Sequence, residues 1–168
     1  ILIICLFPLF LTAQKVRQTK QVNPYALYVK GGGFEGVIFD GSQEESWSHY
    51  ATYGDSLFTP TLEEVEIGEK VLRKQLQEAN QRLDCQKKRQ GPAIHKKLKK
   101  YGRQYYGSIS EKGERLLHIN CFWKADGRYE ERWLKGLILI KDGCSYYWRV
   151  TINLKTQKIT SLWVNGKA

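Results

Sequence analysis

The last third of the chain constrains the fold most, because short apolar-rich runs alternate there with turn sequences. The runs predict five β-strands, at residues 103–110, 115–123, 133–141, 146–154 and 159–164. Polar segments that contain glycine, such as Asp142-Gly143, separate several of these strands. Links this short favour antiparallel strands joined as a meander over βαβ units.

Alternation within the strands separates two faces of the predicted sheet. In residues 146–154, Trp148, Val150 and Ile152 share one face, which is the predicted core face. The opposite face is polar but carries aromatic rings. Tyrosine, tryptophan and arginine are common anchors of protein or glycan contacts; the alternative is that most of these rings lie at the edge of the core. The candidate binding residues on this face are Tyr106, His118, Tyr147, Arg149 and Trp163.

The first 13 residues are apolar and uncharged, and Gln14 and Lys15 follow them. This stretch is too short to span a bilayer as a helix. It is typical of the hydrophobic part of a secretory signal, with Ala13 at the cleavage position. A buried N-terminal strand is the alternative. We therefore expect an exported protein, periplasmic or extracellular, with no membrane span in the mature chain.

The mature chain, residues 14–168, is long enough for a single α+β domain. Its N-terminal part, 14–58, is predicted to be irregular. It is frayed over 14–23 and has two short strands, at 25–30 and 36–40. The main helix is predicted within 59–83, and the antiparallel sheet within 103–165.

The start of the helix is marked by Thr59-Pro60-Thr61 and the acidic residues that follow. Either threonine can cap the helix, and Pro60 suits its first turn. Glu69 falls in a gap of the apolar stripe. A carboxylate there must either reach water at the edge of the stripe or be paired inside. The predicted partner for a buried pair is Arg149 or a tyrosine hydroxyl.

The formal net charge is +10, and it is unevenly spread. Residues 31–69 hold nine acidic side chains and no Lys or Arg, whereas 82–103 hold nine Lys or Arg against one Asp. Such asymmetry favours an anionic partner: an acidic glycan, lipopolysaccharide or an acidic protein. Nucleic acid is unlikely in the expected compartment. The alternative is a solvated basic loop that faces an acidic one. The candidate residues for the anionic partner are Lys87, Lys88, Arg89, Lys96, Lys97, Lys99 and Lys100.

The mature chain keeps three cysteines, Cys85, Cys121 and Cys144, so one thiol is left over from any disulfide. Cys121 and Cys144 share the core face. The meander places them near opposite ends of the sheet, too far apart for a disulfide, so buried thiols are expected. The sequence contains no metal-ligand motif, no cofactor motif and no catalytic signature.

Four motifs support a resemblance over roughly residue 58 to the end of the chain. They are Phe58-Thr59-Pro60-Thr61 opening a helix with Glu69, Arg103-Gln104-Tyr105-Tyr106-Gly107 before Lys112-Gly113-Glu114, Asp142-Gly143-Cys144-Ser145-Tyr146-Tyr147, and Val164-Asn165-Gly166-Lys167-Ala168. Together they resemble a loose group of small secreted bacterial proteins of unknown function, which implies no established activity. By topology only, the chain is also similar to cystatin-like and nuclear-transport-factor-like architectures, and topology does not determine function.

The sequence therefore predicts an α+β fold, with one main helix packed on a curved four- to five-stranded antiparallel meander sheet. The function that we expect is an exported, non-enzymatic binding or inhibitor-like module that contacts an unknown protein or glycan through the aromatic face. One alternative is an enzyme or small-ligand carrier with a pocket in the concavity of the sheet. The other is attachment to an anionic cell-surface polymer through the basic stretch.

Overall fold

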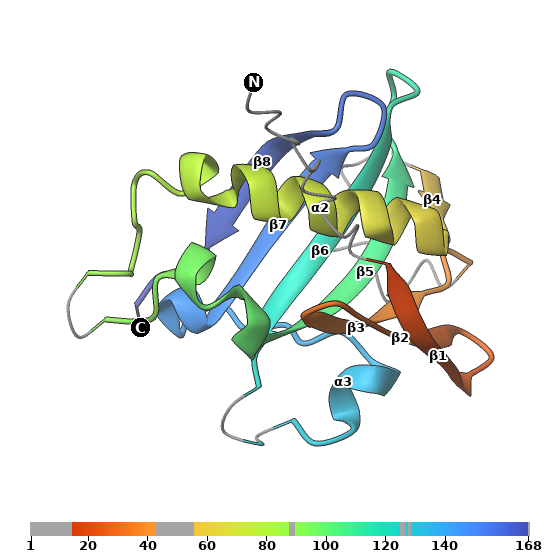
Figure 1. Cartoon of the computed structure of the whole chain (residues 1–168), viewed down its shortest axis with the longest axis horizontal. Helices are drawn as coiled ribbons and strands as arrows, with labels where there is room; N and C mark the ends of the chain where they lie inside the picture. Colours follow the sequence, from red (N-terminus) through yellow and green to blue (C-terminus); the bar gives the residue numbers. More distant parts are fainter. Residues whose placement is uncertain (1–14, 43–55, 88–89, 125–126, 128, 168) are drawn as a thin grey trace, which may run out of the picture.

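The computed structural model describes residues 15–42, 56–87, 90–124, 127 and 129–167. These residues form an α+β fold in which one long helix, α2 (Leu62–Ala79), crosses a mostly antiparallel eight-stranded sheet (Figure 1). The strands are β1 (Val16–Asn23), β2 (Ala26–Gly31), β3 (Phe34–Phe39), β4 (Ser56–Phe58), β5 (Tyr101–Ile109), β6 (Arg115–Trp123), β7 (Tyr147–Asn153) and β8 (Lys158–Val164). The short helical elements are α3 (Arg132–Lys135), η1 (Ile94–Lys96), η2 (Leu98–Lys100) and η3 (Cys144–Tyr146). The α+β class and the antiparallel sheet are confirmed, but the sheet has more strands than expected.

The strands follow the order β1-β2-β3-β5-β6-β7-β8, and β4 pairs with the second half of β5. Strands β5 to β8 form an antiparallel meander. Strand β3 instead runs parallel to β5, with Gly36 opposite Arg103 and Ile38 opposite Tyr105. A parallel pair needs a long crossover connection, and the chain that contains α2 provides it here.

The N-terminal part is more regular than predicted. The strands expected at 25–30 and 36–40 are β2 and β3, and Gly33 between them has a φ of 99°, which favours glycine. Residues 16–23, predicted to be frayed, form β1 and pair with β2. Most β1 side chains are exposed, so this strand has no apolar alternation to reveal it. Backbone hydrogen bonds to β2 hold it instead, and most of the predicted loop after Gly41 lies outside the described residues.

The strand predicted at residues 133–141 is wrong. Its first residues belong to α3, and the chain then runs without regular structure to Ile140. Two buried side-chain amides bind this backbone: Ile138 N donates to Gln104 Oε1 at 2.8 Å, and Asn120 Nδ2 donates to the Ile138 carbonyl at 2.9 Å. Leu137, Ile138 and Ile140 therefore pack on the far face of the sheet without joining it, while Leu139 is 46% exposed. Strand β6 pairs directly with β7.

Helix α2 begins one residue after its cap, Thr61. The Thr61 hydroxyl accepts a hydrogen bond from Glu64 N, and the Glu64 carboxylate accepts one from Thr61 N, which is a capping box. Pro60 lies before the cap and not in the first turn, while Thr59 Oγ1 donates to Asp40 Oδ1 at 3.2 Å. The helix ends at Ala79, earlier than the predicted Leu83.

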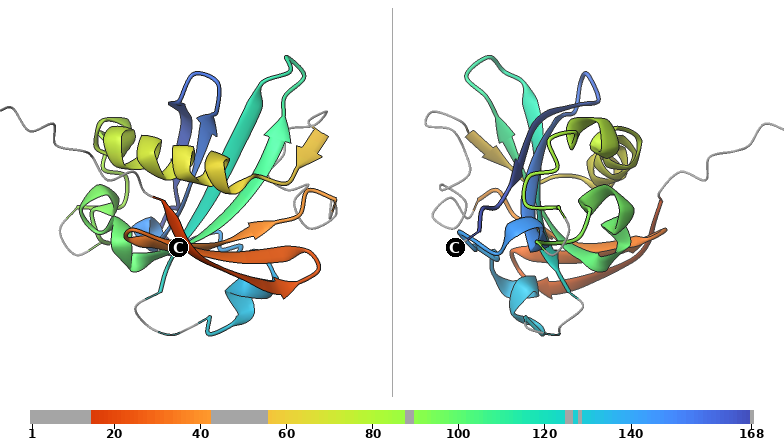
Figure 2. Two further views of the ribbon diagram at one scale, coloured as in Figure 1. Left: turned by 45° about the vertical axis from the view of Figure 1, so that its right-hand side comes forward. Right: turned by 90° about the vertical axis from the view of Figure 1, so that its left-hand side faces the viewer.

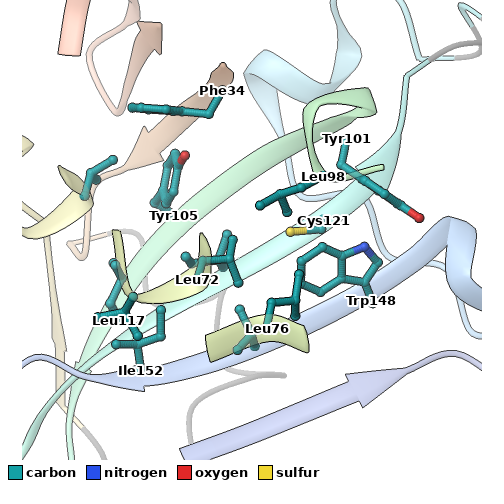
Figure 3. Close-up of a cluster of buried hydrophobic side chains, with 14 of the residues drawn as sticks. Phe34, Leu72, Leu76, Leu98, Tyr101, Tyr105, Leu117, Cys121, Trp148 and Ile152 are labelled. Atoms are coloured by element: carbon teal, nitrogen blue, oxygen red, sulfur yellow. The ribbon is translucent and has the colours of Figure 1, made fainter. Parts of the chain in front are cut away.

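The main core lies between α2 and the sheet. Side chains from α2, the 94–101 segment and strands β5 to β7 meet there, and Figure 3 shows Leu72 and Leu76 of α2 with Leu117, Cys121 and Trp148 of the sheet. The face that carries Trp148, Val150 and Ile152 is buried, which confirms the predicted core face. The views in Figure 2 show α2 and the 94–100 segment on the same side of strands β5 to β8.

The expectation for the cysteines is partly wrong. Cys121 is a fully buried free thiol, but Cys144 forms a disulfide with Cys85, and their Cα atoms are 5.1 Å apart. The chain after α2 turns back toward η3, and this return brings Cys85 to Cys144. Cys121 and Cys144 do not pair, but the predicted reason is wrong: β6 pairs directly with β7, and Cys121 is opposite Trp148, close in the chain to Cys144.

The predicted signal segment, residues 1–13, lies outside the described residues. Among the helices of the described part, none is long and apolar enough to cross a membrane.

Candidate functional site

The aromatic face predicted from the strands is not one open patch. Three of its residues are buried: Tyr106, His118 and Tyr147. The other two, Arg149 and Trp163, are exposed, and 56% of the surface of Trp163 is accessible to solvent. The last two are cross-strand partners, and the Arg149 guanidinium lies 5.4 Å from the centre of the Trp163 ring. The five residues therefore divide into three that are packed inside and two that face outward.

Tyr147 belongs to a second apolar cluster on the face of the sheet opposite α2. Its hydroxyl lies 2.6 Å from that of Tyr129, and both rings are at most 9% exposed. The cluster is completed from β2, β3, β6 and the 129–140 segment by Ala26, Val37, Phe39, Phe122, Trp133 and Ile138. Part of the predicted binding face is therefore a second core.

His118 is engaged at both ring nitrogens. Nε2 lies 2.8 Å from Ser108 Oγ, and Nδ1 lies 3.1 Å from Thr151 Oγ1. The Tyr106 ring stacks on the imidazole at 4.8 Å with an angle of 13° between the planes. The sequence pattern predicts His118 and Tyr106 as site residues but not Ser108, whose place beside His118 comes from the pairing of β5 with β6.

Glu69 forms the buried ion pair that was one of its two expected states. Its Oε1 accepts hydrogen bonds from Arg103 Nε at 2.7 Å and from the Tyr105 hydroxyl at 2.9 Å. The charged partner is Arg103 and not Arg149, and both ionic side chains are fully buried. Desolvation disfavours the charged form of Arg103, yet the neighbouring Glu69 carboxylate holds the pKa of Arg103 above its ordinary value.

The predicted basic stretch lines a groove of about 430 Å³ between α2 and the segment that contains η1 and η2. We call it the basic groove. Its lining residues are Leu72, Arg73, Leu76, Gln77, His95, Lys96, Lys97, Leu98, Lys99 and Lys100. The three leucines are at most 9% exposed and form its floor, whereas Arg73 and the four lysines are exposed. The structure thus combines four of the predicted lysines with a helix that the charge pattern did not include.

The other residues of the basic stretch are placed differently. Lys87 is exposed, but it is not among the residues that line the basic groove. Lys88 and Arg89 lie outside the described residues.

The wall formed by residues 94–100 is fastened at several points. Ile94 N donates to Gln86 Oε1 at 3.0 Å, and Ser145 Oγ donates to the Pro92 carbonyl at 2.8 Å. Arg103, beneath this wall, donates from Nη2 to the Leu98 carbonyl at 2.9 Å. The disulfide between Cys85 and Cys144 ties the chain that leads into the wall. The lysines are therefore carried on a backbone that is held in place.

His95 also lines the basic groove. Its Nδ1 lies 3.3 Å from Asn80 Nδ2, and since an amide nitrogen can only donate, Nδ1 must accept and be unprotonated. Burial, and next the charge of Lys96, lower the pKa of His95 from its ordinary value of 6.5. The structure therefore favours the neutral imidazole.

Arg73 was not identified from the sequence. It contributes to the rim of the groove and also donates from Nη2 to the Gly32 carbonyl at 2.8 Å. A usable pattern was present, since Lys70, Arg73 and Lys74 recur at the three–four spacing on the exposed side of the helix. That pattern predicts a basic helix face, but it does not show that residues 95–100 lie opposite this face and form a groove with it.

No protein-family model matches the chain, and neither the curated proteins nor the solved structures contain a match.

Proposed function

We propose that this protein is an exported, non-enzymatic binding module that holds an anionic ligand in the basic groove. The observation that carries the proposal is the lining itself: Arg73 and four lysines surround one groove, and no acidic side chain is among the described residues that line it. Like charges held together on a fixed backbone favour an opposite charge between them.

The volume and the floor of the groove also support a ligand site. About 430 Å³ lies within the range of cavities that hold small ligands or parts of larger ones. The leucine floor and the methylene stems of the lysines offer apolar contact beneath the charged groups. An acidic sugar, which has charged groups and apolar ring faces, suits both features.

Two features support export. The disulfide between Cys85 and Cys144 is of the kind that persists in oxidising compartments, and the apolar start of the chain is typical of a secretory signal.

The first test is binding of dextran sulfate at increasing salt, measured by isothermal calorimetry. Replacing the four groove lysines, Lys96, Lys97, Lys99 and Lys100, by glutamine should weaken binding roughly ten- to hundredfold and reduce its dependence on salt. The matched control replaces four exposed lysines outside the groove, Lys20, Lys112, Lys135 and Lys141, and loses the same charge. Equal losses in the two variants would show that net charge, and not the groove, binds the polymer.

A second candidate function is enzymatic, and the contact between Ser108 and His118 favours it. A serine hydroxyl 2.8 Å from an imidazole is the pairing of nucleophile and general base in acyl-transfer enzymes. Here both groups are buried, Ser108 fully and His118 with 8% exposed, so a substrate reaches them only if the surrounding side chains move. The group at the other nitrogen is a threonine hydroxyl, where those enzymes often use a carboxylate. This function requires that a fluorophosphonate probe reach the buried Ser108 and label it, and that the label be absent from Ser108→Ala. If the wild-type protein is not labelled, this function is excluded.

A further inference from the structure

A second groove lies on the other side of α2. It has a volume of about 480 Å³, and it is lined by Lys74, Gln75, Glu78, Ala79, Lys158 and Ile159. We call it the β8 groove, since Lys158 and Ile159 begin β8. In Figure 1 the turn between β7 and β8 lies above α2, and the 94–100 segment lies below it. The helix therefore separates two grooves.

Neighbouring residues of α2 contribute to different grooves. Arg73 lines the basic groove and Lys74 lines the β8 groove, because successive side chains of a helix are turned by about 100°. Gln77 and Glu78 repeat this division one turn later. The exposed surface of α2 between the grooves thus carries a cationic side chain toward each groove, Arg73 on one side and Lys74 on the other. Among the described residues that line the two grooves, Glu78 is the only one with a negative charge.

We propose that the two grooves form one path for an extended acidic polysaccharide, which lies in the basic groove, crosses α2 near Arg73 and Lys74, and enters the β8 groove. This inference rests on the proposed function, because it needs the basic groove to bind anions. Beyond the proposed function, the inference specifies that the ligand is a polysaccharide and that it is long enough to reach both grooves. Seven cationic side chains line the path: Arg73, Lys74, Lys96, Lys97, Lys99, Lys100 and Lys158.

The lining favours a polysaccharide over a nucleic acid. Proteins that bind single-stranded nucleic acids stack the bases on aromatic side chains, and no Phe, Tyr or Trp is among the described residues that line either groove. The Glu78 carboxylate would repel a densely charged chain, but it accepts hydrogen bonds from sugar hydroxyls. The Gln77 amide can both donate and accept. An acidic polysaccharide carries widely spaced charges with hydroxyls between them. Such a chain can pair its charges with the lysines and its hydroxyls with Gln77 and Glu78.

The test compares a short and a long oligogalacturonide, polysaccharides whose charge is a carboxylate on each sugar. The long oligomer should bind more tightly than the short one. The variant Lys74→Gln/Lys158→Gln should weaken binding of the long oligomer about three- to tenfold and leave the short oligomer unchanged. The control pair Lys20→Gln/Lys135→Gln should change neither affinity.

Four outcomes would overturn the extended path. Equal affinity for the two lengths, or no effect of the Lys74/Lys158 variant beyond its control, would confine the ligand to the basic groove. Tighter binding of single-stranded DNA than of the long oligomer would assign the path to another polymer. If neither oligomer binds and dextran sulfate does not bind either, the proposed function itself fails, and this result is distinct from the other three.

Discussion

At the scale of single residues, Glu69 connects α2 with β5. Its carboxylate accepts hydrogen bonds from Arg103 and Tyr105 of β5, and Arg103 donates in turn to the carbonyls of Tyr101 and Leu98. The chain of contacts runs from α2 through the core to the wall of the basic groove. The second oxygen, Oε2, is buried without a hydrogen-bond partner among the described residues.

The variant Glu69→Gln should lose about 3–5 kcal/mol of unfolding free energy, because it leaves the charge of Arg103 buried and uncompensated. Urea denaturation followed by tryptophan fluorescence measures this loss. The double variant Glu69→Leu/Arg103→Met, which removes both charges and keeps apolar volume, should recover most of it. Wild-type stability in Glu69→Gln would show that the pair is not held as described.

The environment of His95 predicts that the unfolding free energy depends on pH. Its lowered pKa means that the folded protein favours the neutral ring, so this contribution to stability is complete above pH 6.5 and is lost as the pH falls through the lower folded-state pKa. The difference in unfolding free energy between the wild type and His95→Gln, measured by urea denaturation, should therefore change only below pH 6.5. A difference that stays constant into the acidic range would contradict this.

At the scale of elements, the capping box decides where α2 begins. Thr61→Ala removes the hydroxyl that accepts from Glu64 N and should cost about 1 kcal/mol of unfolding free energy, with a lower helical signal in circular dichroism near the transition. Thr156→Ala, an exposed threonine in the turn between β7 and β8, is the control. A loss no larger than that of the control would mean that Glu64 and the backbone hold the first turn alone.

The β-strands show how pairing overrides local sequence. β1 has few apolar side chains and is a strand because β2 pairs with it, whereas residues 137–140 are apolar and remain irregular because Gln104 and Asn120 bind their backbone. Strand propensity describes fit to a partly buried surface, so it depends on the neighbours that the fold provides.

At the scale of the whole molecule, the disulfide joins two distant parts. Cys85 and Cys144 are 59 residues apart in sequence, and the bond ties the chain after α2 to η3. The variant Cys85→Ala/Cys144→Ala should lose about 2–4 kcal/mol of unfolding free energy, because its unfolded chain is less constrained. It should also bind dextran sulfate more weakly, since the wall of the basic groove loses an anchor.

Reductant provides the control for this prediction. It should destabilise the wild type by a similar amount and leave the double variant unchanged, with urea denaturation as the measurement. Wild-type protein that is insensitive to reductant would mean that the two cysteines are not bonded.

The sequence by itself determined those features that depend on a few neighbouring residues. The start of the helix follows from Thr61 and Glu64, the core face from the alternation in β6 and β7, and the turn at Gly143 from a residue that tolerates a φ of 84°. The basic stretch is likewise visible in the chain. In each case the cause lies in residues that are close together along the chain.

Only the tertiary structure decided which distant residues meet. Arg103 and not Arg149 pairs with Glu69, because the Arg103 side chain shares the core side of the sheet with α2. Cys144 bonds to Cys85 because the chain after α2 turns back toward η3. The four lysines became one side of a groove because α2 supplies the other. Such contacts depend on how the elements pack, and the spacing of residues along the chain does not contain that information.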